Sequence, residues 1–101
     1  MLLRILVVLV GIAILSGCRT PPVQEMSDAR QAIEAARNAG ATPSTSPELG
    51  AAQAAITRAE THLEAKEYAR ARLAALQAKR HASEALADAR QHPQAASPVP
   101  N

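Results

Sequence analysis

The chain has 101 residues, of which 11 are Lys or Arg and 9 are Asp or Glu, so its formal net charge at pH 7 is +2. This near balance of charge does not predict a nucleic-acid-binding surface, and the length allows one small domain at most. Because the only aromatic residue is Tyr68, bulky side chains that could line a substrate cavity are scarce, and we expect neither an enzyme nor a small-molecule substrate.

The first 17 residues have the three-part layout of a secretory signal peptide. One cation, Arg4, precedes an apolar run over residues 5–15, and small residues then lead to the only cysteine, Cys18. At ~1.5 Å per residue the run spans roughly 16 Å, about half of the ~30 Å hydrocarbon layer of a bilayer. The segment therefore predicts a cleaved signal rather than a transmembrane helix.

The end of this segment, Leu15-Ser16-Gly17-Cys18, resembles the bacterial lipobox. In that motif the Cys sulfur receives a diacylglycerol, and cleavage then leaves the Cys as the first residue. The resemblance implies a signal peptide at 1–17, recognised through Leu15, Ser16 and Gly17, and a covalent lipid on Cys18. An ordinary cleavage would instead leave an unpaired thiol in an oxidising compartment.

The resemblance also implies a location. Residues 18–22 would form the lipidated N-terminus and a short spacer to the first helix of the mature chain. Where enterobacterial lipoproteins that stay in the inner membrane have Asp after the lipidated Cys, this chain has Arg19. We therefore expect lipid anchoring in the bacterial outer membrane on its periplasmic side, with the inner membrane less favoured.

A first helix of the mature chain is predicted at about residues 23–39. Apolar residues recur there at steps of three and four, as on one face of a helix. They are Met26, Ala29, Ile33 and Ala36. Gly40 follows where a helix end favours a residue that tolerates the left-handed conformation, and the Thr, Pro and Ser residues that come next predict a loop.

A second helix is predicted at about 47–64. Ser46 suits the N-cap, Pro47 the first helical position, and Glu48 the positive end of the helix dipole. A seam of apolar residues at alternating steps of three and four predicts packing against another helix. It consists of Leu49, Ala52, Ile56, Ala59 and Leu63.

A third helix is predicted at about 67–92, before Pro93. The phase of the apolar pattern changes near residues 64–67, which favours a turn there over one helix running from 47 to 91. The new stripe consists of Tyr68, Ala71, Ala75, Ala78, Ala82, Ala85 and Ala89. A second apolar face is predicted on the opposite side, at Ala69, Leu73, Leu76 and Ala87, which would place this helix between two neighbours.

These elements predict an all-α fold, a small up-down-up three-helix bundle within an alanine-rich domain at 23–92. Alanine accounts for 23 of residues 18–101, so close approach of the helices rather than bulky side chains would stabilise it. We expect a thin core, marginal stability and association with itself or a partner protein. The last stretch, 93–101, contains three prolines and predicts a disordered tail.

Candidate catalytic and metal-ligating residues are few. Apart from Asp88 with His92, the histidines have no acidic or histidine partner at metal-site spacing along the chain, so we predict solvated surface histidines and no metal site. Two carboxylate pairs, Glu60 with Glu64 and Glu84 with Asp88, share helix faces but have no apolar pocket to shift their pKa values. We expect no catalytic residue and no cofactor besides the lipid on Cys18.

Four features together resemble the small alanine-rich bacterial lipoproteins that carry a helical domain of unknown function. They are the lipobox, a first helix ending Asn38-Ala39-Gly40-Ala41, the start Pro47-Glu48-Leu49, and the opening Tyr68-Ala69-Arg70-Ala71 of the last helix. Relatives sometimes join this domain to an OmpA-like peptidoglycan-binding domain. This chain departs from the family by having Lys66-Glu67 before the tyrosine instead of Gly-Asp, and by stopping without a peptidoglycan-binding domain.

The function expected from these features is that of a membrane-anchored, non-catalytic structural or adaptor protein of the cell envelope. Its helix faces would bind another envelope protein or a second copy. The alternative is a coiled-coil spacer between membrane and peptidoglycan, similar to the murein lipoprotein. The phase change near residue 65 and the terminal Asn101, where such a spacer would have a Lys, argue against it.

Overall fold

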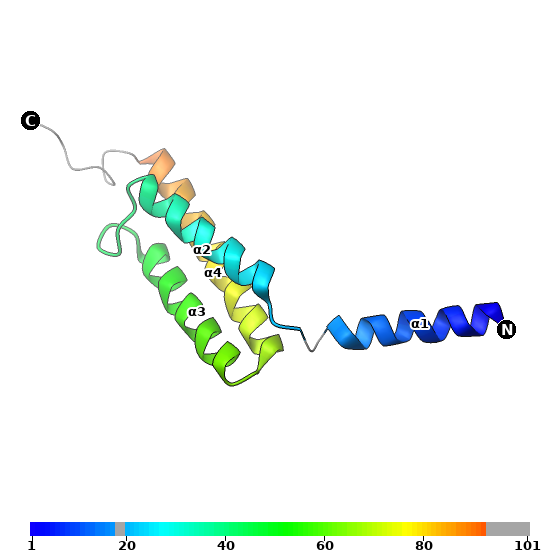
Figure 1. Cartoon of the computed structure of the whole chain (residues 1–101). Helices are drawn as coiled ribbons and strands as arrows, with labels where there is room; N and C mark the ends of the chain where they lie inside the picture. The colour runs from blue at the N-terminus through cyan, green and yellow to red at the C-terminus, as the bar shows by residue number, and fades with distance from the viewer. Residues whose placement is uncertain (18–19, 93–101) are drawn as a thin grey trace, which may run out of the picture.

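The computed structural model describes the backbone of residues 1–17 and 20–92, and all of their side chains except those of 10–17. Within these ranges the chain forms four helices and no strand: α1 (Leu2–Gly17), α2 (Val23–Asn38), α3 (Pro47–Glu64) and α4 (Tyr68–Gln91) (Figure 1). The predicted all-α class is confirmed, and the bounds of α2, α3 and α4 lie within a residue of the predicted ones. The helix count differs from three because the segment before Cys18 is itself helical. The predicted tail at 93–101 lies outside the described residues.

Helix α1 stands apart from the other three in its packing. Among the described residues, helix packing joins only α2, α3 and α4, and every large apolar side chain that the structure describes in α1 is exposed. These side chains are Leu2, Leu3, Ile5, Leu6, Val7, Val8 and Leu9. No helix in the described ranges is both long enough and apolar enough to cross a membrane.

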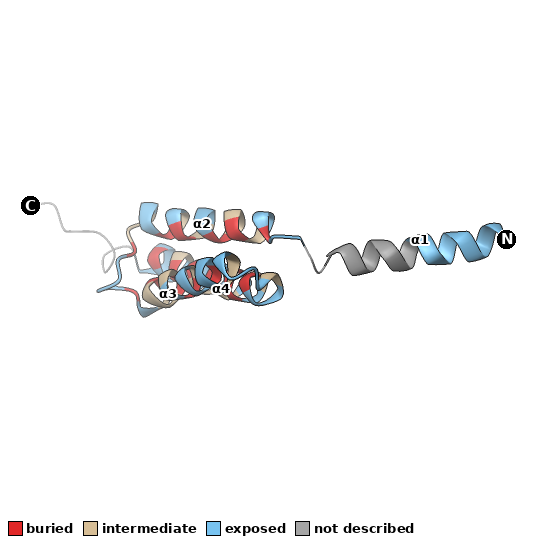
Figure 2. Cartoon of the chain, turned by 60° about the horizontal axis from the view of Figure 1, so that its bottom comes forward, coloured by how far each residue is buried: buried red, intermediate tan, exposed pale blue. Residues whose placement is uncertain are grey.

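Helix α4 is the centre of the packing. It contacts both α3 and α2 extensively, whereas α2 and α3 touch each other far less. Figure 1 shows that α3 runs antiparallel to α4 and that α2 runs in the same direction as α4. In Figure 2 the buried residues of α2 lie on the side that faces the other two helices.

The core is built mainly from alanine. The predicted stripe of α2 is buried, as is all of the α4 stripe after Tyr68. In α3, Leu49, Ala52 and Ala59 are fully buried, while Ile56 is half-buried and packs against all three clusters of core residues. Because alanine side chains are small, the helices lie close together. A few larger side chains fill the space that remains between them. These are Met26, Ile33, Leu49 and Ile56.

The predicted second apolar face of α4 is wrong. Leu73 is 59% exposed and Leu76 49% exposed, and Ala69 and Ala87 are exposed as well. Helix α4 reaches both neighbours with one broad face, because Ala74 joins the predicted stripe as a buried residue. A flat alanine surface lets α2 and α3 lie on the same side of α4, so no opposite face is needed.

Two residues at the α3–α4 turn are less buried than the seam prediction implied. Leu63 and Tyr68 are only partly buried, and neither belongs to a core cluster. Ala55, which the seam pattern left out, is instead fully buried. The seam widens by one residue because α3 faces both α4 and the edge of α2.

The predicted helix starts and ends agree with the structure. The Ser46 hydroxyl accepts a hydrogen bond from the backbone N–H of Leu49 at 3.2 Å, with Pro47 at the start of α3. At the end of α2, Gly40 has a φ of 103°. The N–H of Gly40 donates to the Arg37 carbonyl, and that of Ala41 donates to the Ala36 carbonyl, which is the Schellman pattern.

The predicted turn between the second and third helices is also confirmed, since α3 ends at Glu64 and α4 begins at Tyr68. It repeats the same Schellman pattern. The N–H of Lys66 donates to the Leu63 carbonyl at 3.0 Å, and the N–H of Glu67 donates to the His62 carbonyl at 2.8 Å. Here the left-handed position is occupied by Lys66, with a φ of 60°.

Candidate functional site

The predicted lipidation site cannot be compared with the structure, since Cys18 lies outside the described residues. The three residues before it, Leu15, Ser16 and Gly17, form the last part of α1, and only their backbone is described. The lipid anchor and its recognition residues therefore stay predictions from the sequence.

The predicted helix-packing residues are brought together, with the exceptions of Leu63 and Tyr68. Leu49 and Ala82 share one core cluster, Ala75 belongs to a second, and Ala78 belongs to a third with Ala29 and Ala55. Ala71 is fully buried. These contacts lie inside the domain, so this stripe is the seam on which α2 and α3 pack.

Ion pairs join the helices at the edges of this seam. The Arg72 Nε donates to Glu25 Oε1 at 3.2 Å, with both side chains 29% exposed, and Lys79 lies 3.8 Å from Asp28. Both pairs join α4 to α2. A third pair at 3.4 Å, Arg30 with Glu60, joins α2 to α3 and is half-exposed, where such pairs contribute little.

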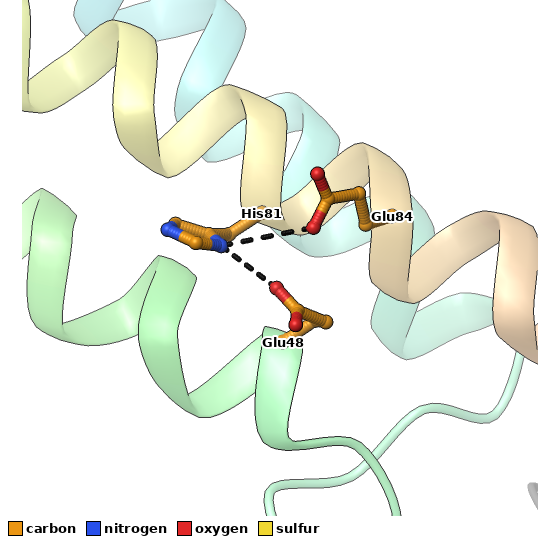
Figure 3. A group of neighbouring side chains, drawn as sticks. All are labelled: Glu48, His81 and Glu84. Carbon is orange, nitrogen blue, oxygen red and sulfur yellow. Dashed lines mark hydrogen bonds and ion pairs between the residues drawn. The ribbon is translucent and has the colours of Figure 1, made fainter.

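One group of titratable side chains, Glu48, His81 and Glu84, brings together residues of two helices (Figure 3). Nδ1–H of His81 donates to Glu48 Oε2 at 2.7 Å, and Glu84 Oε2 lies 3.9 Å from the same nitrogen. Glu48 belongs to the first turn of α3, while His81 and Glu84 lie one turn apart on α4. The antiparallel packing of α3 on α4, which are connected in the chain by the turn at 65–67, thus brings the three side chains together.

The electrostatics of this group favour an ionised Glu48. The hydrogen bond from His81 is the main cause that lowers the pKa of the Glu48 carboxyl, and Glu84 adds to the effect. Because a lowered pKa means that the folded state prefers the carboxylate, this pairing stabilises the fold near neutral pH. The contribution is lost as the pH falls through the folded-state pKa of Glu48.

Two histidines have acidic partners at spacings other than the four-residue one that the sequence was searched for. His62 Nδ1 lies 3.2 Å from Glu67 Oε1, and His81 contacts the two glutamates just described. The partners were missed because a search along one helix finds only Glu84, three residues from His81. Finding Glu48 requires the antiparallel arrangement of α3 on α4, which follows from the predicted turn near residues 64–67.

A shallow hollow of about 280 Å³ lies beside this group, at the end of the domain formed by the 39–46 loop and the end of α4. Ser46, Asp88 and His92 contribute its polar lining, and Ala41, Ala85 and Ala89 its apolar lining. The hollow opens to solvent.

The comparisons with known proteins give a family. The family model described as "Domain of unknown function (DUF4398)" matches residues 24–97. No curated protein and no solved structure matches the chain.

Proposed function

We propose that this chain, which belongs to the family described as Domain of unknown function (DUF4398), is a lipid-anchored, non-catalytic structural or adaptor protein of the bacterial envelope. Residues 1–17 would be removed, Cys18 would carry the lipid, and the mature protein would consist of a three-helix bundle, α2 to α4, on a short spacer. Its expected place is the periplasmic side of the outer membrane.

The observation that carries the proposal is the character of α1 and of the residues that follow it. Every large apolar side chain described in α1 is exposed, so the domain does not use this helix for its own folding. An exposed apolar surface of this kind indicates an interaction with a membrane or an apolar partner. The lipobox-like Leu15-Ser16-Gly17-Cys18 follows this apolar run directly in the sequence, which supports cleavage before Cys18.

An adaptor role is supported by the outer face of α4. Leu73 and Leu76 are both about half exposed or more. The domain has few large apolar residues, yet these two do not contribute to its core. The inner face of α4 is already occupied by α2 and α3. The outer face therefore offers a helix surface through which an envelope protein could contact the domain.

The spacer alternative is less well supported by the arrangement of the helices. A murein-lipoprotein-like spacer needs one long uninterrupted helix, whereas α3 and α4 fold back on each other at Lys66. The antiparallel pair halves the reach that residues 47–91 would have as one helix.

The anchor is tested by replacing the cysteine. In a bacterial host, the wild-type protein should partition into the detergent phase, because acyl chains contribute ~0.8 kcal/mol for each buried CH₂. Cys18→Ser should either move the cleaved domain to the aqueous phase or leave residues 1–17 attached. His62→Gln, a change at a partly buried residue far from the anchor in sequence, serves as the control and should partition like the wild type. Membrane partition of a cleaved Cys18→Ser protein would contradict the proposal.

A further inference from the structure

We propose that Glu48, His81 and Glu84 form a binding site for a divalent transition-metal ion of the zinc type, held between α3 and α4. The site goes beyond the envelope function proposed above and does not depend on the lipid anchor. Figure 3 shows the three side chains converging from the two helices, with one nitrogen of the His81 ring pointing toward both carboxylates.

The spacing of the donor atoms fits such an ion. The nitrogen of His81 lies 2.7 Å from one carboxylate oxygen and 3.9 Å from the other, and one donor atom of each residue lies within 4.8 Å of the others. In a tetrahedral site with metal–ligand distances of ~2.1 Å, ligand atoms are roughly 3.4 Å apart. Small side-chain rotations, of Glu84 above all, would bring the three atoms to that spacing.

The chemistry of the donors selects the class of metal. Carboxylates alone would suit Mg²⁺ or Ca²⁺, but an imidazole nitrogen together with carboxylate oxygens suits Zn²⁺ and its neighbours in the first transition row. To bind the ion, Nδ1 of His81 would give up its hydrogen bond to Glu48, and the ring would take the neutral tautomer that carries its proton on Nε2. The two carboxylates then supply two negative charges, which balance the charge of the ion. Three protein ligands leave a coordination position for water.

The residues around the proposed metal site leave its free coordination position accessible to water. The side chain of His81 is 28% exposed and that of Glu84 is 49% exposed, so the site is open to solvent on one side. Arg80 is the nearby cation whose charge acts on Glu48, but its side chain is exposed. Water therefore screens its repulsion of a bound ion. We expect a site of modest affinity that exchanges its metal.

Metal binding would also act on the fold. Glu48 begins α3 and the other two ligands lie on α4, so one ion would join two helices whose core contacts are mostly alanine. A ligand that binds only the folded state stabilises it by mass action. Because the ion needs ligands from both helices, zinc should raise the melting temperature as well as bind.

The test uses the untagged full chain, purified in detergent under reducing conditions, with zinc binding measured by titration calorimetry and melting followed by circular dichroism. We expect one Zn²⁺ per chain at this site and a rise in melting temperature with Zn²⁺ that Mg²⁺ at the same concentration does not produce. His81→Gln should weaken this binding at least tenfold and abolish the rise.

Two further variants separate metal binding from folding. Glu84→Gln removes a ligand that lies 3.9 Å from His81 and leaves the Glu48–His81 hydrogen bond in place, so it should weaken zinc binding at least tenfold while the metal-free melting temperature falls less than in His81→Gln. His62→Gln, which removes a histidine paired with a single carboxylate, should bind zinc as the wild type does. Equal zinc affinity in the wild type, His81→Gln and Glu84→Gln would overturn the proposal, as would the absence of saturable binding by the wild type.

Discussion

The residue that bears the most backbone strain in the described chain is Lys66. It is the only non-glycine residue there with a positive φ, at 60°, and it ends α3 in the conformation that Gly40 adopts at the end of α2. For a residue with a Cβ, this left-handed conformation costs roughly 1–2 kcal/mol of conformational free energy. The two Schellman hydrogen bonds of the turn, together with the contacts of α4 on α3, offset that cost.

Lys66→Gly should therefore stabilise the protein. Glycine adopts the left-handed conformation without a steric penalty but loses more entropy on folding, so we expect a net gain of about 0.5–1 kcal/mol in the free energy of unfolding. Chemical denaturation followed by circular dichroism measures this. Lys66→Ala is the matched control, since it removes the charge but keeps the Cβ, and it should not stabilise. Equal effects of the two variants would show that strain at Lys66 is not the cause.

Single residues were predicted from the sequence where a local rule decides their role. Ser46, Pro47 and Gly40 have side chains or backbone freedom that suit one position at a helix end, and the structure places them there. Lys66 has no such signature, because only the geometry of the turn makes it left-handed. The His81 cluster could not be found by local spacing either, since Glu48 lies 33 residues away in the chain.

At the scale of the elements, the change of phase near residue 65 was the most informative signal. The apolar seam of α3 and that of α4 differ in register, and the structure places a turn between them. The apolar pattern of the sequence did not predict how many residues wide the buried face of each helix is. Alanine is compatible with both buried and exposed helix positions, so Ala74 and Ala87 look alike in the sequence although one is buried and the other exposed.

The alanine stripe of α4 makes a prediction about packing. Ala78 is fully buried against Ala29 of α2 and Ala55 of α3, so Ala78→Leu would push both helices away and cost ~1–3 kcal/mol by overpacking. The melting temperature should fall, and the fall should not depend on protein concentration, because the contact lies within one chain.

Ala87→Leu is the control for this change on the same helix. Ala87 is exposed, so the same added volume there should change the free energy of unfolding by no more than ~0.5 kcal/mol. If Ala78→Leu melts like the wild type, α2 and α3 do not pack on this stripe.

At the scale of the whole molecule, the two ends of the helical domain differ. Arg72, in the first part of α4, donates to the backbone carbonyl of Thr20 at 3.3 Å, so the chain enters the domain close to the α3–α4 turn (Figure 1). The loop at 39–46 and Glu48 lie at the opposite end. In a protein anchored at Cys18, the Lys66 turn would therefore be near the membrane, and the proposed metal site would be farther from it.

In the proposed anchoring of the protein, residues 1–17 are a removable signal and Cys18 carries the lipid. The most direct measurement is the intact mass of the protein purified from the membranes of a bacterial host, with fragmentation of its N-terminus. We predict a chain that begins at Cys18 and carries acyl chains on that residue. A chain that still begins at Met1, or one that begins at residue 18 with an unmodified thiol, would contradict the claim.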